Sequence, residues 1–526
     1  MRGWGLNARR AALGVALTGL ASLACSTIMG SPRIFPTPRP PTPTTGYTPF
    51  PNGLPGSPTP VPVLGTATAV FGTLTPEAAT AEAAGATAEA AGVTVTPPPA
   101  DGNYQAQSGD TVSSLALRFR TDIATLLLAN PTLPLTQTLA PGEWLNMPLE
   151  GIPAGAYDTR LLPDAEVVFS PSAASFDVQG YVQSQPGFLA SYTELVSDSR
   201  PPDPGWKIVA DTARHYSLNP RLLLALLELQ SGALSNANPS DFARSHALGV
   251  EAPSLAPGLS HQLGWAGNQL LYGYYSWQAG TEVKFLLADG ARREGDGRLN
   301  AGSFAVARLL GLVYKRDGFE LVTNGDALLG VYRRLFGQVP PDEPLIPGGL
   351  AQPELQLPFE PQRPWSYTGG PHATYGLTQP WGALDFAPPS EHPGCVQSLE
   401  WETAVGDGFV ALSEEGLVEL DVGGGWTVVY LHVATLDRVP QGAILQKGEH
   451  IGHPSCEGGR ATGTHLHLSR RYQGVWIPAD GFAPFVLSGW AAHSLGAAYS
   501  GSLTRGQDII YSCSCGKIST RIELEP

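Results

Sequence analysis

The sequence predicts a multidomain protein with a small β-α-α-β module, an α-helical middle domain and an antiparallel β-rich C-terminal domain. Its 526 residues are more than one hydrophobic core usually organises. Proline-rich stretches at residues 25–100 and 339–364 separate the candidate domains. Apolar residues recur at helical spacing in residues 206–232, whereas residues 365–490 alternate short apolar runs with glycine turns.

The negative net charge of the chain argues against a nucleic-acid partner. The formal net charge is −15, and only 15% of the residues are charged. A nucleic-acid-binding protein usually carries a basic patch or stripe, and none is found here. We therefore expect no nucleic-acid partner.

The pattern of residues 1–24 predicts a signal peptide for export. Arg2, Arg9 and Arg10 give it a positive start, and the apolar run that follows is too short for a comfortable membrane span. The run ends in Ser22-Leu23-Ala24-Cys25, which resembles a bacterial lipobox. The resemblance implies cleavage before Cys25 and lipidation of this residue, so that the chain is anchored to the membrane. Ordinary secretion is the alternative.

Residues 25–100 are rich in proline, threonine and alanine and cannot form a core. We expect a disordered linker that gives the following domains reach from the anchor.

Residues 104–148 form the compact module. A strand and turn lead to Asp110 or Thr111, either of which can cap a helix. Asp122 begins a second helix that ends at Asn130-Pro131, and a second strand follows. The Gly109-Asp110-Thr111 turn, Asn130 and the Pro141–Leu145 ending resemble a LysM domain. The resemblance implies binding to N-acetylglucosamine-containing glycans such as peptidoglycan; a small spacer domain is the alternative.

The middle domain, residues 155–345, is predicted to be helical, with Asn219-Pro220 beginning one helix. Residues 216–232 resemble the catalytic helix of lysozyme-like lytic transglycosylases, in which a glutamate precedes Ser-Gly. Gln230 stands at that position, and an amide cannot supply the proton of a general acid. Glu228 falls on a different helix face. We therefore expect either a lysozyme-like shape without its chemistry or a generic helical spacer. Five aromatic residues could line a sugar-stacking groove or belong to the core: Trp265, Tyr272, Tyr274, Tyr275 and Trp277.

The C-terminal domain contains a His-x-His pair, His465 and His467. On a strand both rings would project from one face into a groove. Upstream stand His372, Asp385 and His432. Three His or Asp ligands with an open fourth position are typical of a catalytic zinc site. Gly423, Gly424 and Gly425 predict a hairpin between the runs 416–422 and 426–432.

Residues 366–490 resemble the lysostaphin-type zinc endopeptidases, which cut peptidoglycan peptides or bridges. The matching segments are Gly369–His372, Leu384–Phe386, Tyr430–His432, Gly448–Gly452 and Gly463–His467. The resemblance implies one Zn²⁺ held by His372, Asp385 and His467, with His432 and His465 as the catalytic pair beside it.

One ligand position departs from the common pattern. The commoner members have a histidine four residues before the aspartate, where this chain has Trp381. His372 lies further upstream, as in the β-lytic and staphylolysin branch. We expect Gly369 and Gly370 to let a flexible start of the domain fold back and deliver His372.

Four cysteines remain if Cys25 is lipidated, and they allow three pairings. Cys395 and Cys456 both fall in the peptidase-like domain, and we expect them to form a disulfide. Cys513 and Cys515 lie in a C-terminal β extension, residues 491–526. They pair, bind metal or stay reduced.

Two functional hypotheses follow. In the first, the protein is a lipid-anchored zinc endopeptidase outside the cytoplasm, associated with the cell wall through its LysM module. In the second, it is a non-catalytic peptidoglycan-binding scaffold or an activator of other hydrolases. The complete set of five metal-site groups favours the enzyme.

Overall fold

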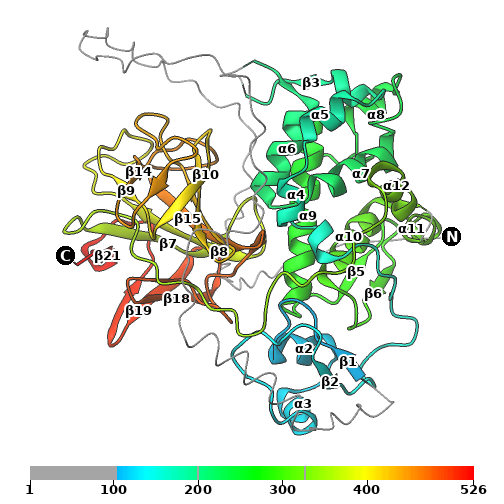
Figure 1. Cartoon of the computed structure of the whole chain (residues 1–526), viewed down its shortest axis with the longest axis horizontal. Helices are drawn as coiled ribbons and strands as arrows, with labels where there is room; N and C mark the ends of the chain where they lie inside the picture. The colour runs from blue at the N-terminus through cyan, green and yellow to red at the C-terminus, as the bar shows by residue number, and fades with distance from the viewer. Residues whose placement is uncertain (1–102, 198–200, 325–326, 526) are drawn as a thin grey trace, which may run out of the picture. The chain divides into compact units, whose positions relative to one another are not determined.

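The computed structural model describes residues 103–197, 201–324 and 327–525 (Figure 1). The expected signal peptide, the lipidation site Cys25 and the linker 25–100 lie outside these residues. Within them, no helix combines the length and the apolar character that crossing a bilayer requires.

The first described module has the predicted β-α-α-β order. Its elements are β1 (Asn103–Gln105), α2 (Val112–Arg118), α3 (Ile123–Ala129) and β2 (Trp144–Asn146). Thr111 begins α2, because its Oγ1 accepts a hydrogen bond from the Ser114 backbone N–H while the Ser114 hydroxyl oxygen accepts one from Thr111 N–H. Asp122 caps α3, because its Oδ1 accepts a hydrogen bond from Thr125 N–H at 2.8 Å.

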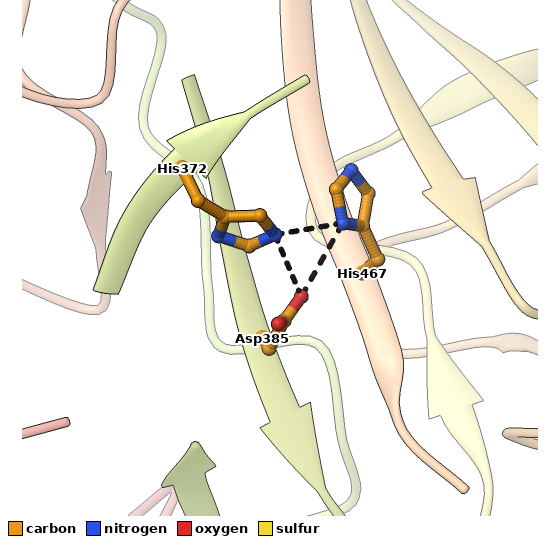
Figure 2. Close-up of side chains that lie close together, drawn as sticks. All are labelled: His372, Asp385 and His467. Atoms are coloured by element: carbon orange, nitrogen blue, oxygen red, sulfur yellow. Dashed lines mark hydrogen bonds and ion pairs between the residues drawn. The ribbon is translucent and has the colours of Figure 1, made fainter. Parts of the chain in front are cut away.

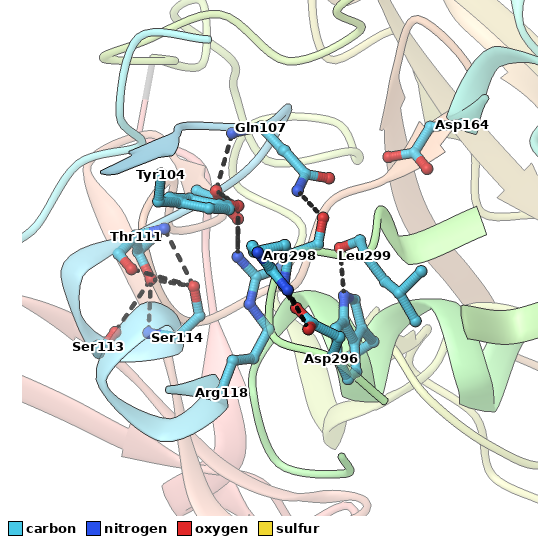
Figure 3. A network of polar contacts seen from close by, with 12 residues as sticks. Tyr104, Gln107, Thr111, Ser113, Ser114, Arg118, Asp164, Asp296, Arg298 and Leu299 are labelled. Atoms are coloured by element: carbon cyan, nitrogen blue, oxygen red, sulfur yellow. Dashed lines mark hydrogen bonds and ion pairs between the residues drawn. The ribbon is translucent and has the colours of Figure 1, made fainter. Parts of the chain in front are cut away.

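Asp110 does not cap the helix; it belongs to a buried network with Tyr104 and Arg118. Figure 3 labels Tyr104 and Arg118 of this network. The Tyr104 hydroxyl donates to Asp110 Oδ2 at 2.5 Å, and Arg118 Nη2 donates to Asp110 Oδ1 at 2.6 Å. Buried charges are tolerated when they are paired in this way. The Gln107 side-chain amide donates to the Arg298 carbonyl at 2.8 Å and so joins the module to the helical region.

The middle region is helical, as predicted. Its α-helices are α4 (Pro171–Ala174), α5 (Val178–Gln183), α6 (Gly205–Tyr216), α7 (Pro220–Ser231), α8 (Asp241–Ser245), α9 (Leu259–Gln278), α10 (Ala301–Val313), α11 (Arg316–Thr323) and α12 (Leu328–Phe336). Helix α7 begins because Asn219 caps it and Pro220 needs no intrahelical N–H partner. It ends at Gly232, whose φ is +62°. Helix α9 packs against α6 and α10.

The main sheet of the C-terminal region is antiparallel (Figure 1, yellow-green to red). The strand order is β13 (Ile444–Leu445), β10 (Gly408–Glu414), β11 (Leu417–Gly423), β12 (Trp426–Leu431), β15 (Leu466–Tyr472), β8 (Trp381–Ala387), β7 (Trp365–Ala373) and β21 (Arg521–Ile522), and β16 (Val475–Trp476) pairs with β15. The predicted hairpin at Gly423–Gly425 connects β11 to β12. Buried apolar residues of these strands form the core of this region.

The chain end returns to this sheet. Strands β17 (Val486–Leu487), β18 (Trp490–Ala497), β19 (Ser500–Arg505) and β20 (Asp508–Tyr511) form a second antiparallel sheet, and β21 then pairs with the edge of β7. The β18–β19 hairpin contacts β7, the strand that carries His372. Residues close to the C-terminus therefore support the strand of a candidate ligand.

Candidate metal centre

Three neighbouring strands bring the three expected ligands together. His467 lies on β15, Asp385 on β8 and His372 on β7, and His467 faces Asp385 directly in the strand register. On β7 the register shifts between Gly369 and His372, and this irregularity places His372 away from the position opposite Asp385. A Cβ atom on Gly369 would lie 2.5 Å from Asp385 Oδ2, so only glycine fits there.

The prediction that a flexible segment folds back to deliver His372 is wrong. His372 is buried within the nine-residue strand β7, which pairs with β8 and β21. Gly369 and Gly370 are needed for close packing. A Cβ atom on Gly370 would come within 2.4 Å of Gly501 N, in the β18–β19 hairpin. Sheet pairing and this hairpin fix the position of His372.

The ligand atoms converge on one point (Figure 2). His372 Nε2 lies 3.1 Å from His467 Nδ1, and each of these nitrogens lies 3.3 Å from Asp385 Oδ1. All three side chains are buried.

Backbone carbonyls fix the tautomers of both imidazoles. The second nitrogen of His372, Nδ1, lies 2.8 Å from the Gly370 carbonyl, and the second nitrogen of His467, Nε2, lies 2.9 Å from the Thr374 carbonyl. A carbonyl only accepts, so these ring nitrogens carry the protons. His372 Nε2 and His467 Nδ1 are then left with lone pairs that face each other and a carboxylate.

This donor set fits a zinc ion. Two imidazole lone pairs and a carboxylate oxygen repel one another unless a cation lies between them. Asp385 Oδ1 is buried and, among the described residues, accepts no hydrogen bond. Tetrahedral zinc with bonds of about 2.0–2.1 Å places its ligand atoms about 3.3 Å apart, which agrees with the separations found here. Each histidine also has the carbonyl partner that orients metal ligands.

The electrostatic coupling in the site is visible in the pKa values. Burial alone would raise the pKa of Asp385, but the imidazoles of His372, His467 and His465 hold it well below its usual value. Burial lowers the pKa of His372, but the Asp385 carboxylate outweighs this and the net shift is upward. For His467 burial prevails and the pKa falls. The lowered pKa of Asp385 favours its charged form, which suits a cation.

The two remaining histidines border the centre. His432 follows β12 directly, in the left-handed region with φ +73°, and His465 precedes β15. Their ring centroids lie 4.6 Å apart, and His465 Nε2 lies 3.7 Å from Asp385 Oδ1. Each directs Nδ1 to a carbonyl, of Glu457 for His432 and of Gly463 for His465. Burial, together with the neighbouring imidazoles of His465 and His467, lowers the pKa of His432 to about 3, which keeps this ring neutral.

Sequence reasoning missed Tyr499. Its ring stacks on His372 with the centroids 4.1 Å apart, and its backbone carbonyl accepts a hydrogen bond from Gly370 N–H. Tyr499 occupies the turn between β18 and β19 with φ +66°, which is unusual for a bulky residue. The signal in the sequence is weak: one aromatic residue in a turn of small residues.

Trp381 is not part of the centre. It begins β8 and pairs with Ala373 across the strands. Cys395 and Cys456 form the expected disulfide, with their Cα atoms 5.8 Å apart. Of the alternatives for Cys513 and Cys515, the structure shows a disulfide.

In the helical region, the candidate catalytic groups support the fold. Gln230 Oε1 accepts a hydrogen bond from the Tyr314 hydroxyl at 2.9 Å. Glu228 is buried and accepts from Leu234 N–H, Ser235 N–H and the Ser235 hydroxyl. Of the five aromatic residues, the three buried ones belong to the core, Tyr274, Tyr275 and Trp277. Trp265 and Tyr272 are partly exposed.

Comparison with known families identifies the C-terminal region. Residues 394–478 match the model of Peptidase family M23. The C-terminal domain belongs to peptidase family M23. It is thus a metallopeptidase domain, in a family of zinc enzymes, and His467 lies in the matched part. Residues 104–148 match the LysM domain model, and residues 160–346 match the model described as LasA, N-terminal domain. The lysozyme-like resemblance of the helical region stays a prediction.

The similarity to known proteins extends beyond the M23 domain. Protease LasA of Pseudomonas aeruginosa is 27% identical over 394 residues, which cover 68% of this chain and 87% of the relative. The beta-lytic metalloendopeptidase of Achromobacter lyticus is 28% identical over 167 residues, 30% of this chain and 42% of the relative. The solved structure of the M23 metalloprotease pseudoalterin covers 31% of this chain and 96% of its own, with 21% identity and a TM-score of 0.28.

Proposed function

We propose that the protein is a lipid-anchored cell-wall hydrolase, a zinc-dependent endopeptidase that cuts peptide bonds in peptidoglycan stem peptides or bridges. The LysM module holds the enzyme on the glycan, and Cys25 anchors it to the outer face of the cell membrane. The observation that carries the proposal is the convergence of His372 Nε2, Asp385 Oδ1 and His467 Nδ1, three buried atoms that can each bind a metal ion. A scaffold without chemistry would have no need for such a set.

The roles of the residues follow from their atoms. His372, Asp385 and His467 would hold the zinc, which supplies Lewis-acid activation of the scissile carbonyl and of water. His432 and His465 keep Nε2 available because Nδ1 of each is engaged by a carbonyl. Nε2 of one of the pair would take the proton of the attacking water, and a ring that is protonated on Nε2 would donate to the negative charge that develops on the carbonyl oxygen and so stabilise it. Tyr499 keeps the His372 ring in place by stacking on it.

The test uses the full chain. We expect about one zinc per chain by elemental analysis, and new amino ends after incubation with purified peptidoglycan, located by mass spectrometry of the fragments. Asp385→Ala is the matched control and should release none. A zinc-loaded protein that binds peptidoglycan without opening any peptide bond would instead support the scaffold.

The anchor is tested separately. Cys25→Ser should move the protein from the membrane fraction to the medium, whereas Cys513→Ser should not. Retention of the Cys25→Ser protein in the membrane would contradict the lipid anchor and leave the peptidase proposal unaffected.

A further inference from the structure

Helix α9 presents an unusual outer face. None of its 20 residues is Asp, Glu, Lys or Arg. One stripe at helical spacing is partly exposed, namely Trp265, Asn268, Gln269 and Tyr272, while most of the remaining helix is buried. The solvent-facing stripe of an amphipathic helix normally carries charged residues. Aromatic rings alternating with amides suit a ligand that is neutral, polar and partly apolar.

This stripe lines a cavity. A hollow of about 500 Å³ lies over Trp265, Gln269, Tyr272 and Arg308 of α10, bordered by Leu255 and by Leu377 with Thr378. The volume is in the range of small-molecule sites. Trp265 and Tyr272 are two helical turns apart, about 10.5 Å along the axis, which is close to the length of a disaccharide.

The polar groups of the cavity are held in place. Arg308 Nη1 donates to Gln269 Oε1 at 2.9 Å, and the guanidinium carbon lies 4.5 Å from the centroid of the Tyr272 ring. The Tyr272 hydroxyl donates to Glu282 Oε2 at 3.1 Å. Arg308 Nη1 also donates to the Gln269 backbone carbonyl at 3.4 Å. In the described part of the chain, Nε and Nη2 of Arg308 and the side-chain amide nitrogen of Gln269 have no protein acceptor. They are donors for the hydroxyl and acetamido oxygens of a sugar.

A second hollow, of about 320 Å³, shares Arg308 with the first. Lys284 and Arg292 also line it, and Glu282 is its acidic residue. Cationic side chains outnumber acidic ones here, although the whole chain has a net charge of −15. A neutral, aromatic part followed by a cationic part suits a polymer of sugar rings that bears carboxylate substituents.

A hydrogen bond connects this face to the loop between two strands of the metal centre. Asn268 Oδ1 accepts from Leu377 N–H at 2.8 Å. Leu377 lies in the loop between β7 and β8, the two strands that carry His372 and Asp385. A ligand on α9 would therefore touch the segment that joins two metal ligands.

We propose that the α9 cavity, with Trp265, Gln269, Tyr272 and Arg308, is a second glycan-binding site that takes two adjacent sugar rings of a peptidoglycan strand. The inference rests on the proposed peptidoglycan substrate and deepens it. The apolar C–H faces of the sugars pack on the two aromatic rings, and Arg308 and Gln269 donate to their oxygens.

Hydroxyl-radical footprinting of the full chain tests the site directly. The probe is peptide-free glycan strands, prepared by removing the stem peptides from peptidoglycan. We expect the oxidation rates of Trp265 and Tyr272 to fall at least about twofold on binding, because the sugar covers both rings. Tyr511, which is 57% exposed in β20, is the reference that should not change. Unchanged oxidation of Trp265 and Tyr272 at saturating glycan overturns the proposal, as does equal protection by free stem peptide.

Variants separate this site from the LysM module and from the catalytic centre. Trp265→Ala and Arg308→Gln should each slow release from intact peptidoglycan several-fold, yet leave zinc content and cleavage of a short peptide substrate unchanged. His261→Ala is the matched control, because His261 is exposed on the same helix but does not line the cavity. If all forms fail to cleave either substrate, the proposed function is wrong, while the footprint still decides the glycan site. Release at the wild-type rate by both variants counts against it.

Discussion

The helical domain and the M23 domain both contain partly or fully buried polar side chains, and they use them in opposite ways. In the helical domain, Glu228 accepts three hydrogen bonds and Gln230 accepts one from Tyr314. In the M23 domain, the carbonyls of Gly370 and Thr374 take the imidazole protons and leave lone pairs of His372 and His467 directed at Asp385. Polar side chains whose hydrogen bonds are all made stabilise the fold. Acceptor atoms that converge without a donor can instead bind a cation.

The largest expected effect tests this difference at the metal centre. His372→Ala should lower zinc affinity by more than about 100-fold, because even an outer partner of a ligand is worth about 10–100-fold, and hydrolysis should fall to background. Zinc analysis after dialysis and a peptidoglycan release assay measure both. Trp381→Phe is the control and should keep zinc and most of the activity. A zinc-replete His372→Ala protein would mean that another group completes the site.

Tyr499 is expected to have a smaller effect. Tyr499→Leu removes the ring that stacks on His372, and it should weaken zinc binding about tenfold, as loss of an orienting partner does. Competition with a chromophoric chelator measures the affinity. Tyr499→Phe preserves the stack and should preserve the affinity; an equal loss in both variants would assign the effect to the hydroxyl group.

Glu402 of β9 (Glu402–Thr403) is a counterexample within the M23 domain. It is fully buried, neither carboxylate oxygen has a hydrogen-bond partner among the described residues, and burial raises its pKa well above 4.5. The folded state therefore keeps the proton, and the unfolded state loses it above its ordinary pKa. Stability should fall by about 1.4 kcal/mol per pH unit between the unfolded and the folded pKa.

Glu402→Gln should remove this pH dependence. Thermal unfolding at pH 4 should be similar in both proteins, whereas at pH 8 the variant should have the higher Tm. Equal melting temperatures at pH 8 would show that Glu402 is charged in the folded protein and has a partner.

The smallest effect is expected in the helical domain. Gln230→Glu restores the acid that lytic transglycosylases use, yet the domain should still release neither anhydro nor reducing sugar ends. If the wild-type chain released such ends, and the Glu228→Gln variant released them as well, the prediction that this domain does not cleave glycan strands would be wrong.

The Glu228→Gln substitution should lower the free energy of unfolding by about 1–3 kcal/mol, because it disturbs a buried set of hydrogen bonds. It should not change peptide hydrolysis.

Much of the fold was predictable because its signals are local. Thr111, Asp122 and Asn219 cap helices within three residues, and Gly423–Gly425 turn a hairpin within one loop. The sequence left Asp110 and Thr111 as equal candidates for one cap. The tertiary structure shows that Thr111 is the cap, because Asp110 forms a buried ion pair with Arg118.

The centre was predictable to the extent that a motif marks it. His465 and His467 form a recognisable pair, and the resemblance supplied His372 and Asp385. The carbonyls of Gly370 and Thr374, and the ring of Tyr499, could not be read from the sequence, because their partners lie on other strands. The prediction that a flexible segment delivers His372 was wrong for the same reason. The pairing of β7 with β8 and β21 cannot be predicted from the residues around His372.

The placement of the ligands on three strands links metal binding to the folding of the domain. His372 and His467 are 95 positions apart in the chain, so the unfolded polypeptide must close a long loop before both can hold one ion. An ion bound at this point would connect β7, β8 and β15, and its binding free energy would become part of the stability of the sheet. A chelator should therefore lower the melting temperature of the domain as well as stop its chemistry.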